Sequence, residues 1–255
     1  MNSFIKLQNL SVEGFNVNAG RMGIKHRLIN IFNTREKKLN CDKKIKILKN
    51  INFEAKKGDR IGILGANGCG KTSLLRVIVG TYPPVSGVVE KNGTIVSMVG
   101  CGAEFIHTLD AIDNIKLLMI YTNRYHEYND ELLEKILLFA ELEEQRNVPL
   151  YQYSSGMLAR LSFAANIFQS GNILITDEVF ATGDSRFIHK SRDKMKDLWN
   201  KVDIAITVSH DIEDIRELCT TCYVMQKGEI IYYGVTEDAI KFFDKNYTNN
   251  TNAHR

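Results

Sequence analysis

The stretch Gly65-Ala66-Asn67-Gly68-Cys69-Gly70-Lys71-Thr72 decides the fold, because it fits G-x-x-x-x-G-K-[ST] without a mismatch. It follows a short apolar run typical of a buried parallel strand, and a helix is predicted to follow it. Glycines let such a loop curl until its N–H groups face phosphate oxygens, and the helix N-terminus adds its positive dipole end. The sequence therefore predicts a phosphate site running from Gly65 through Ser73. Lys71 is expected to reach the β- and γ-phosphates and Thr72 to coordinate Mg²⁺.

A second candidate part of the site is the acid pair Asp177-Glu178, which ends the apolar run Ile173–Thr176. Ligands of α/β sheets bind at the carboxyl ends of the strands. We expect Asp177 to hold Mg²⁺, directly or through water, and Glu178 to polarise the attacking water as a general base. Standing alone, the pair would be read as solvated acids at a strand end. The phosphate loop favours the catalytic interpretation.

Strand patterns alternate with helical patterns along the chain, which indicates an α/β fold with a parallel sheet. Strands are predicted at Phe4–Leu10, Ile45–Phe53, Arg60–Leu64, Val96–Val99, Ile173–Thr176, Val202–Val208, Cys222–Gln226 and Glu229–Tyr233. Helices are predicted from Lys71 to about Val79, over most of Asp113–Phe168, and from about Thr236 to Phe243. Pro83-Pro84 and Gly87 are expected to break the chain. The polar residues after 246 are expected to be disordered.

Composition narrows the class of protein. The 255 residues are 44% hydrophobic and 25% charged, as in ordinary globular proteins, and no apolar run reaches the 18 residues of a membrane-spanning helix. The N-terminus lacks the apolar core of a signal peptide. Five cysteines are too few for a disulfide scaffold, so reduced thiols are expected, and Cys219-Thr220-Thr221-Cys222 is read as a pair of buried structural thiols.

Positive charge is concentrated in residues 21–49, which hold ten lysines and arginines against two acids, although the net charge of the chain is only +3. Such a block suggests an anionic neighbour such as a membrane surface or nucleic acid. Within it, Met22–Phe32 has the spacing of a short helix lying at a membrane interface. A solvated insertion loop is an equally good interpretation.

Three further segments complete a series of motifs in a fixed order. They are Tyr153-Ser154-Ser155-Gly156-Met157 at a predicted helix start, Ala181-Thr182-Gly183-Asp184, and His210 after the strand Val202–Val208. With the phosphate loop and the acid pair, they resemble the nucleotide-binding subunit of an ABC transporter. The resemblance implies a P-loop NTPase with a RecA-like parallel-sheet core, an N-terminal antiparallel β part and an inserted α-helical subdomain.

The resemblance also assigns roles. Ser154, Ser155 and Gly156 would be the signature loop that contacts ATP held by a second subunit. Asp184 would end the D-loop, and His210 would be the switch histidine at the γ-phosphate. The aromatic that stacks on adenine would be Phe15 by position, with Phe32 as a competitor.

A narrower resemblance is to the ABC ATPases that export O-antigen, capsule or teichoic acid. It is carried by Tyr-Ser-Ser-Gly-Met at 153–157, by Asp-Glu-Val-Phe-Ala-Thr-Gly-Asp at 177–184, and by the basic insertion before the phosphate loop. The chain departs from most transporter ATPases in having no glutamine in Gly100–Phe105, the loop that senses the membrane subunit. Whether Glu104 replaces it stays open.

The resemblance implies one ATPase domain over residues 1–245. Its ATP-binding core would comprise residues 1–107 and 170–234, with the basic insertion near 16–44. A helical subdomain would span 108–169, a C-terminal helix 235–246 and a disordered tail 247–255. We expect ATP and Mg²⁺ as ligands, a homodimer around ATP, and a separate membrane permease in two copies at the cytoplasmic face of the inner membrane. Nucleic acid is not expected.

Alternatives from other classes stay open at this point. The same kind of ATPase subunit could power an exporter of a lipid or a drug. A soluble ABC ATPase acting on nucleic acid or in cofactor assembly would use the basic block as its contact. A regulator that binds but does not hydrolyse nucleotide is disfavoured by Glu178.

Overall fold

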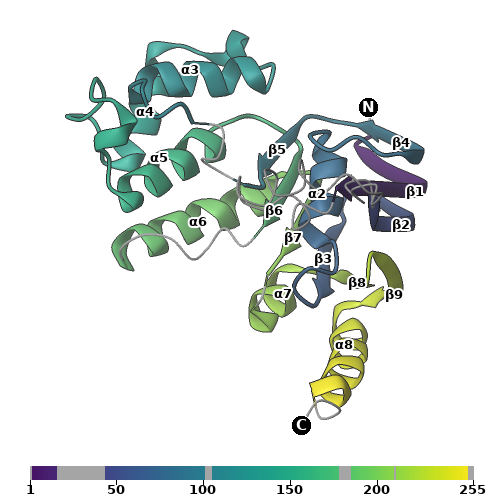
Figure 1. Cartoon of the computed structure of the whole chain (residues 1–255). Helices are drawn as coiled ribbons and strands as arrows, with labels where there is room; N and C mark the ends of the chain where they lie inside the picture. Colours follow the sequence, from purple (N-terminus) through teal and green to yellow (C-terminus); the bar gives the residue numbers. More distant parts are fainter. Residues whose placement is uncertain (1, 16–43, 101–104, 178–184, 210, 252–255) are drawn as a thin grey trace, which may run out of the picture.

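The computed structural model describes residues 2–15, 44–100, 105–177, 185–209 and 211–251 (Figure 1). In this part of the chain the strands form two sheets. The first is antiparallel, in the order β2-β1-β4, and consists of β1 (Phe4–Phe15), β2 (Lys44–Lys56) and β4 (Ser86–Asn92). The second, in the order β5-β6-β7-β3-β8-β9, consists of β3 (Arg60–Gly65), β5 (Ile95–Met98), β6 (Ile173–Asp177), β7 (Ile204–Val208), β8 (Thr221–Gln226) and β9 (Glu229–Val235). In it only β9 pairs antiparallel, at the edge.

The parallel strands are buried because both faces of the second sheet are covered. β7 is buried over its whole length, and β3 and β6 each contain a run of four buried residues. Apolar runs of this kind were the sequence signal for these strands. Inside the sheet, the Thr176 hydroxyl donates a hydrogen bond of 2.7 Å to the Thr207 hydroxyl and joins β6 to β7. The predicted α/β fold, with a parallel core and an antiparallel N-terminal part, is confirmed.

The helices include a group with its own hydrophobic core. They are α2 (Lys71–Val79), α3 (Ala111–Tyr121), η2 (Tyr125–Glu127), α4 (Asp130–Ala140), η3 (Leu150–Gln152), α5 (Ser155–Ile167), α6 (Ser185–Lys201), α7 (Ile212–Leu218) and α8 (Thr236–Thr251). Helices α3, α4 and α5 share a cluster around Ile115, Leu137 and Leu161, and we call them, with η2 and η3, the helical unit. Figure 1 shows it on the opposite side of the parallel sheet from the antiparallel sheet. The predicted subdomain boundaries at 108 and 169 stay predictions.

Strand β4 corrects the expectation that Gly87 breaks the chain. Gly87 lies inside the strand, with a φ of +93°, and a Cβ there would come within 2.5 Å of the Leu10 Cα. The glycine therefore allows β4 to approach β1 closely, and the strand continues on both sides of it.

The C-terminal helix corrects a second expectation. α8 extends to Thr251, beyond the predicted end at Phe243 and into the tail expected to be disordered. Its first half is fixed by the buried Ile240 and by stacking of Phe242 on Tyr232, with ring centroids 4.6 Å apart. Because no glycine or proline occurs between residues 236 and 251, nothing in the sequence stops the helix once it has formed. Residues 252–255 lie outside the described part.

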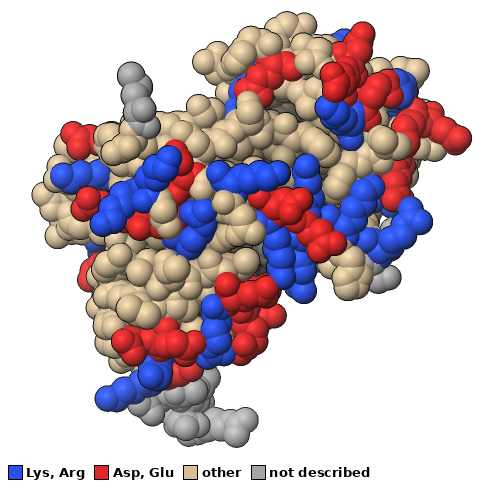
Figure 2. Space-filling model, turned by 180° about the vertical axis from the view of Figure 1, so that it is seen from behind, with Lys and Arg blue, Asp and Glu red and all other residues tan. Residues whose placement is uncertain are grey.

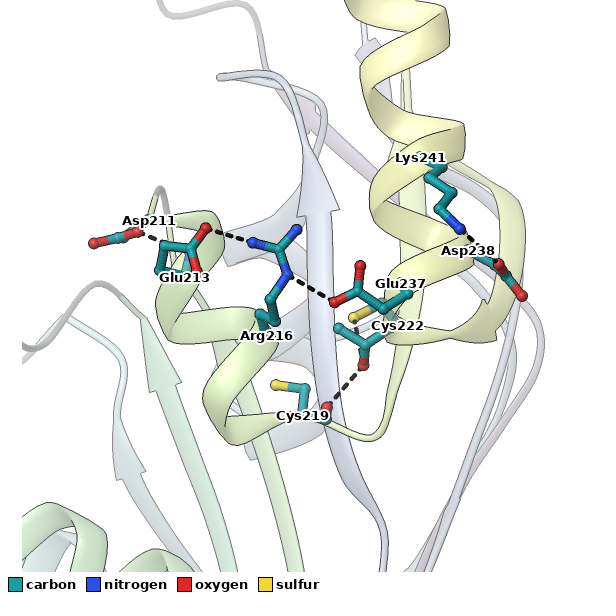
Figure 3. A network of polar contacts seen from close by, with 9 residues as sticks. Asp211, Glu213, Arg216, Cys219, Cys222, Glu237, Asp238 and Lys241 are labelled. Carbon is teal, nitrogen blue, oxygen red and sulfur yellow. Dashed lines mark hydrogen bonds and ion pairs between the residues drawn. The ribbon is translucent and has the colours of Figure 1, made fainter.

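Helices α6 and α7 were not predicted, and both are fixed by contacts with distant residues. The Trp199 indole of α6 donates a hydrogen bond of 3.1 Å to the carbonyl of Leu218 at the end of α7. Figure 3 shows how α7 meets α8: Arg216 Nε contacts Glu237 Oε1 at 2.7 Å, and the carbonyl of Cys219 accepts a hydrogen bond of 2.8 Å from the Thr236 hydroxyl. The predicted helix at Met22–Phe32 lies outside the described residues.

Over the described residues, every helix is too short or too polar to cross a lipid bilayer.

Candidate functional site

The phosphate loop connects β3 to α2, as predicted. Its backbone needs glycine at two positions. Gly65 has a φ of +155°, and a Cβ there would lie 2.6 Å from both the Cys69 sulfur and the Met225 carbonyl oxygen. Gly70, with a φ of +113°, is the N-cap residue of α2, and a Cβ there would lie 2.9 Å from the Leu48 side chain. The tight curl of the loop therefore requires glycine at positions 65 and 70.

Lys71 points back into the loop. Its side chain is 7% exposed, and its ammonium donates hydrogen bonds to the carbonyl oxygens of Gly65 at 2.7 Å and Ala66 at 3.2 Å. The positive charge thus lies inside the curve of the loop, beside the N-terminus of α2. Both the ammonium and the helix end favour an anion at this point.

The two predicted metal ligands meet although they are 105 residues apart. The Thr72 hydroxyl, in the first turn of α2, donates a hydrogen bond of 2.7 Å to Asp177 Oδ2 at the carboxyl end of β6. Both groups are oxygen donors, the type that Mg²⁺ prefers, and neighbouring oxygens around an octahedral Mg²⁺ lie about 3 Å apart. The pair therefore fits one magnesium ion.

The phosphate loop is also held by backbone hydrogen bonds to residues that are distant in sequence. The backbone N–H of Gly228, in the turn between β8 and β9, donates to the Cys69 carbonyl at 2.9 Å, and the Gly228 carbonyl accepts from the Lys49 N–H at 2.8 Å. The strands predicted at Cys222–Gln226 and Glu229–Tyr233 leave only this two-residue turn between them. Its contact with the phosphate loop had no sequence signal, because it depends on β8 lying next to β3.

The candidate signature loop lies at the start of α5. The Ser154 hydroxyl oxygen accepts a hydrogen bond of 3.2 Å from the Met157 N–H and caps the helix, while Ser154 and Ser155 are exposed and Gly156 is half-exposed. Helix α5 packs on α3, α4, α6 and β5. Figure 1 shows it well apart from α2. The phosphate loop and the signature loop therefore form two separate exposed sites within one chain.

Several predicted site residues cannot be placed. Glu178, Asp184, His210 and Glu104 lie outside the described residues, and β1 ends at Phe15, whose side chain is also outside them. The neighbours of His210 are described. The Asp211 carboxylate accepts a hydrogen bond of 2.9 Å from the Glu213 N–H and caps α7.

The three described cysteines are buried and form no disulfide with one another. Burial raises the pKa of the Cys69, Cys219 and Cys222 thiols above the ordinary value. The expectation of structural thiols at Cys219 and Cys222 agrees with this burial. No cluster of three or more metal-ligating His, Cys, Asp or Glu side chains occurs among the described residues.

A groove of about 540 Å³ separates the end of α2 from the helical unit. Its lining includes Val79 and Thr81 after α2, Ser97 of β5, Tyr121 and Thr122 at the end of α3, and Asn166 of α5. Tyr121 is 71% exposed. A neighbouring hollow, which shares several of these residues, reaches Gly100, the first residue of the segment Gly100–Phe105.

Charged side chains are mixed on the face of the molecule shown in Figure 2. Lysines and arginines cross it in a band, with aspartates and glutamates beside them. A nucleic-acid interface would need a surface of one sign. Residues 21–43, most of the basic block on which the nucleic-acid alternative depends, lie outside the described residues.

The fold, the phosphate loop after β3, and Asp177 at the end of β6, two strands from β3 in the sheet, define the class of protein. It is a P-loop nucleotide-binding protein. A family model described as ABC transporter matches residues 48–181. The chain therefore belongs to the ABC transporter family and is an ATP-binding ATPase cassette, which confirms the resemblance found in the sequence.

Known relatives support the narrower resemblance. The chain is 33% identical over 198 residues to "Teichoic acids export ATP-binding protein TagH" of Lactococcus lactis subsp. lactis (strain IL1403), a match that spans 78% of this chain and 42% of that protein. It is 36% identical over 184 residues to "O-antigen export system ATP-binding protein RfbE" of Yersinia enterocolitica, spanning 72% of this chain and 77% of that protein.

A solved structure with the same fold is entitled "Dimeric structure of a post-hydrolysis state of the ATP-binding cassette MJ0796 bound to ADP and Pi". It aligns with a TM-score of 0.67 at 21% identity and covers 91% of this chain and 98% of the other. This likeness establishes the cassette fold of the chain.

Proposed function

We propose that the chain is the ATP-hydrolysing subunit of a transporter and powers a separate membrane permease that exports a lipid-linked cell-surface polysaccharide. The observation that carries the ATPase part is the contact between Thr72 and Asp177, with Lys71 folded into the loop beside it. Both relatives described above are named for export of surface polymers. Their names favour a polysaccharide such as O-antigen or teichoic acid over a lipid, a drug or a soluble role.

In this proposal, the loop N–H groups and Lys71 bind the β- and γ-phosphates of ATP. Thr72 and Asp177 would hold Mg²⁺, which when bound neutralises negative charge on those phosphates. Glu178 follows Asp177 and accepts a proton from the attacking water. His210, which precedes α7 in the sequence, would contact the γ-phosphate, and an aromatic side chain, Phe15 by position, would stack on adenine.

The proposal requires two copies of the chain. One copy carries one phosphate loop and one signature loop, and they lie apart. A C₂ dimer places Ser154, Ser155 and Gly156 of one copy, together with Asp184, against ATP held by the phosphate loop of the other, and completes two equivalent sites. ATP then favours the closed dimer, and hydrolysis opens it.

The permease is proposed to dock in the groove between α2 and the helical unit. This groove adjoins Gly100 and exposes Tyr121, an amphipathic side chain suited to a protein contact. Two permease copies would match the two subunits and hold them at the cytoplasmic face of the membrane. The basic segment 21–49 is proposed to contact the lipid surface. The division into a core of 1–107 and 170–234 and a helical subdomain of 108–169 belongs to the same proposal.

Replacement of the gene in its native host by a Glu178→Gln allele tests the export function. The variant should assemble but not hydrolyse ATP, so surface polysaccharide should be lost and polymer should accumulate inside the cell, as seen on gels of both fractions. A Glu90→Gln allele, which changes an exposed acid of β4 in the same way, is the matched control and should export normally. Unchanged surface polymer in cells that contain the Glu178→Gln protein would contradict the proposal.

A further inference from the structure

We propose that Arg124 is a positioning residue for ATP hydrolysis: it fixes the helical unit, and with it the signature loop, to the parallel sheet. This inference rests on the proposed function. Arg124 lies between α3 and η2, and its side chain is 2% exposed. Arginine is rarely buried to this extent unless it is held by hydrogen bonds.

The guanidinium group of Arg124 bridges two segments of the sheet region. Nη2 donates a hydrogen bond of 2.7 Å to the carbonyl of Ile95, the first residue of β5, and Nη1 donates to the carbonyl of Ser170, which lies just before β6. The contact with the second segment is doubled, since the Ser170 N–H donates to Glu127 Oε2 at 3.3 Å. One short turn of the helical unit thus holds the amino-terminal ends of two neighbouring strands.

The arginine is firmly attached to the helical unit. Its backbone N–H donates to the Met119 carbonyl at 2.6 Å and closes the end of α3, which packs on α5. Movement of the helical unit as a body therefore requires the guanidinium to leave its carbonyl partners. Because Arg124 is almost fully buried, breaking these hydrogen bonds would leave its guanidinium charge without partners, which is unfavourable.

The sheet side of the contact is rigid as well. Asn172, two residues after Ser170, accepts a hydrogen bond of 2.7 Å from the Thr94 N–H and donates one of 2.8 Å to Ser3 Oγ. Ser3 in turn donates to Asp203 at 2.7 Å. This chain of hydrogen bonds ties the segments before β5, β6 and β7 together, so Arg124 is held by a fixed frame.

A small tilt of α5 at the end held by Arg124 would displace the signature loop at its other end. Ser170 follows the end of α5, and the signature loop lies at the other end of this 13-residue helix, about 20 Å away. A tilt of about 5° at the anchored end would move the signature loop by roughly 1.7 Å over that length. Misplacement of about 1 Å in a reacting site can lower a rate by roughly a hundredfold. ATP bound by the phosphate loop, which belongs to the sheet, should not be affected.

The test compares Arg124→Gln and Arg124→Lys with an Arg146→Gln control in the purified chain. Arg146 is matched because its guanidinium is also held by hydrogen bonds, to Glu134 at 2.5 and 2.8 Å and to the Glu143 carbonyl at 2.9 Å, but all of them lie inside the helical unit. The measurements are kcat, the dissociation constant of a fluorescent ATP analogue, and the melting temperature, with rates taken below the melting transition of each variant. Arg124→Gln should lower kcat by roughly ten- to a hundredfold and leave nucleotide affinity within about twofold. Arg124→Lys should recover part of the rate, and Arg146→Gln should match the wild type.

Two results would overturn the inference. One is a kcat of folded Arg124→Gln within twofold of the wild type. The other is a parallel loss of kcat and nucleotide affinity, which would indicate a purely structural role. As a second readout, Arg124→Gln in a Glu178→Gln background should weaken ATP-dependent dimerisation at least tenfold. Failure of the Glu178→Gln protein itself to dimerise would contradict the proposed function rather than the role of Arg124.

Discussion

Gly65 and Gly58 both have a positive φ, but only Gly65 is crowded. A Cβ at Gly65 would lie 2.6 Å from two atoms, whereas a Cβ at Gly58, with a φ of +97°, has open space around it. We expect Gly65→Ala to lower the free energy of unfolding by about 3 kcal/mol, from backbone strain plus overpacking, and Gly58→Ala by about 1 kcal/mol, from strain alone. Urea denaturation of both variants measures the difference. Equal losses would show that the phosphate loop relaxes around the added methyl group.

The contact between Thr72 and Asp177 leads to a prediction about metal dependence. Asp177→Asn removes a charged oxygen ligand, so it should lower kcat by roughly a hundredfold or more, and EDTA should abolish hydrolysis by the wild type. Asp193→Asn, at an exposed position of α6, is the control and should retain wild-type kcat. Phosphate release with Mg²⁺ present checks all three cases. Full activity of Asp177→Asn would remove this residue from the metal site.

At the scale of elements, the start of α8 is anchored to the end of α7 by one buried side chain. Thr236 is 5% exposed, donates to the Cys219 carbonyl at 2.8 Å and lies 3.6 Å from the Cys222 sulfur (Figure 3). Thr236→Val keeps the shape but leaves that carbonyl unpaired, so it should lower the free energy of unfolding by about 1–2 kcal/mol.

The matched control is Thr81→Val, because the Thr81 hydroxyl also donates to a carbonyl, that of Arg76, but is exposed. Water can replace its bond, so the loss should stay within about 0.5 kcal/mol. Thermal or urea unfolding of the two variants measures the contrast. A similar small loss at Thr236 would mean that α8 is not anchored there.

Elements with a strong local pattern were predictable from the sequence, and those without one were not. Helix α2 has the predicted bounds because the glycine loop and Gly80 mark its two ends. Helix α6 was not predicted, although Phe187, Met195 and Trp199 lie on its buried face. The fourth buried position in this series, between Phe187 and Met195, is the polar Ser191, which interrupts the apolar pattern. Helix α7 has seven residues, of which only Ile215 is buried, too few to define a period.

At the scale of the whole molecule, the sequence motifs of the site were predictable, but the residues that hold those motifs in place were not. The sequence indicated Lys71, Thr72 and Asp177 because each has a fixed place in a motif, and the structure brings them together. Arg124 and Gly228 have no motif. Their partners lie 29 or more residues away, so their roles depend on strand order, which a single sequence does not reveal.

The central claim about the whole molecule is that two copies of the chain enclose ATP between the phosphate loop of one and the signature loop of the other. Sedimentation velocity of the purified Glu178→Gln protein tests it most directly. The protein should sediment as a monomer without nucleotide and as a dimer with saturating Mg²⁺-ATP, and Ser155→Arg in the same background should abolish the dimer by blocking the signature loop. A protein that binds ATP but stays monomeric at saturation would contradict the claim.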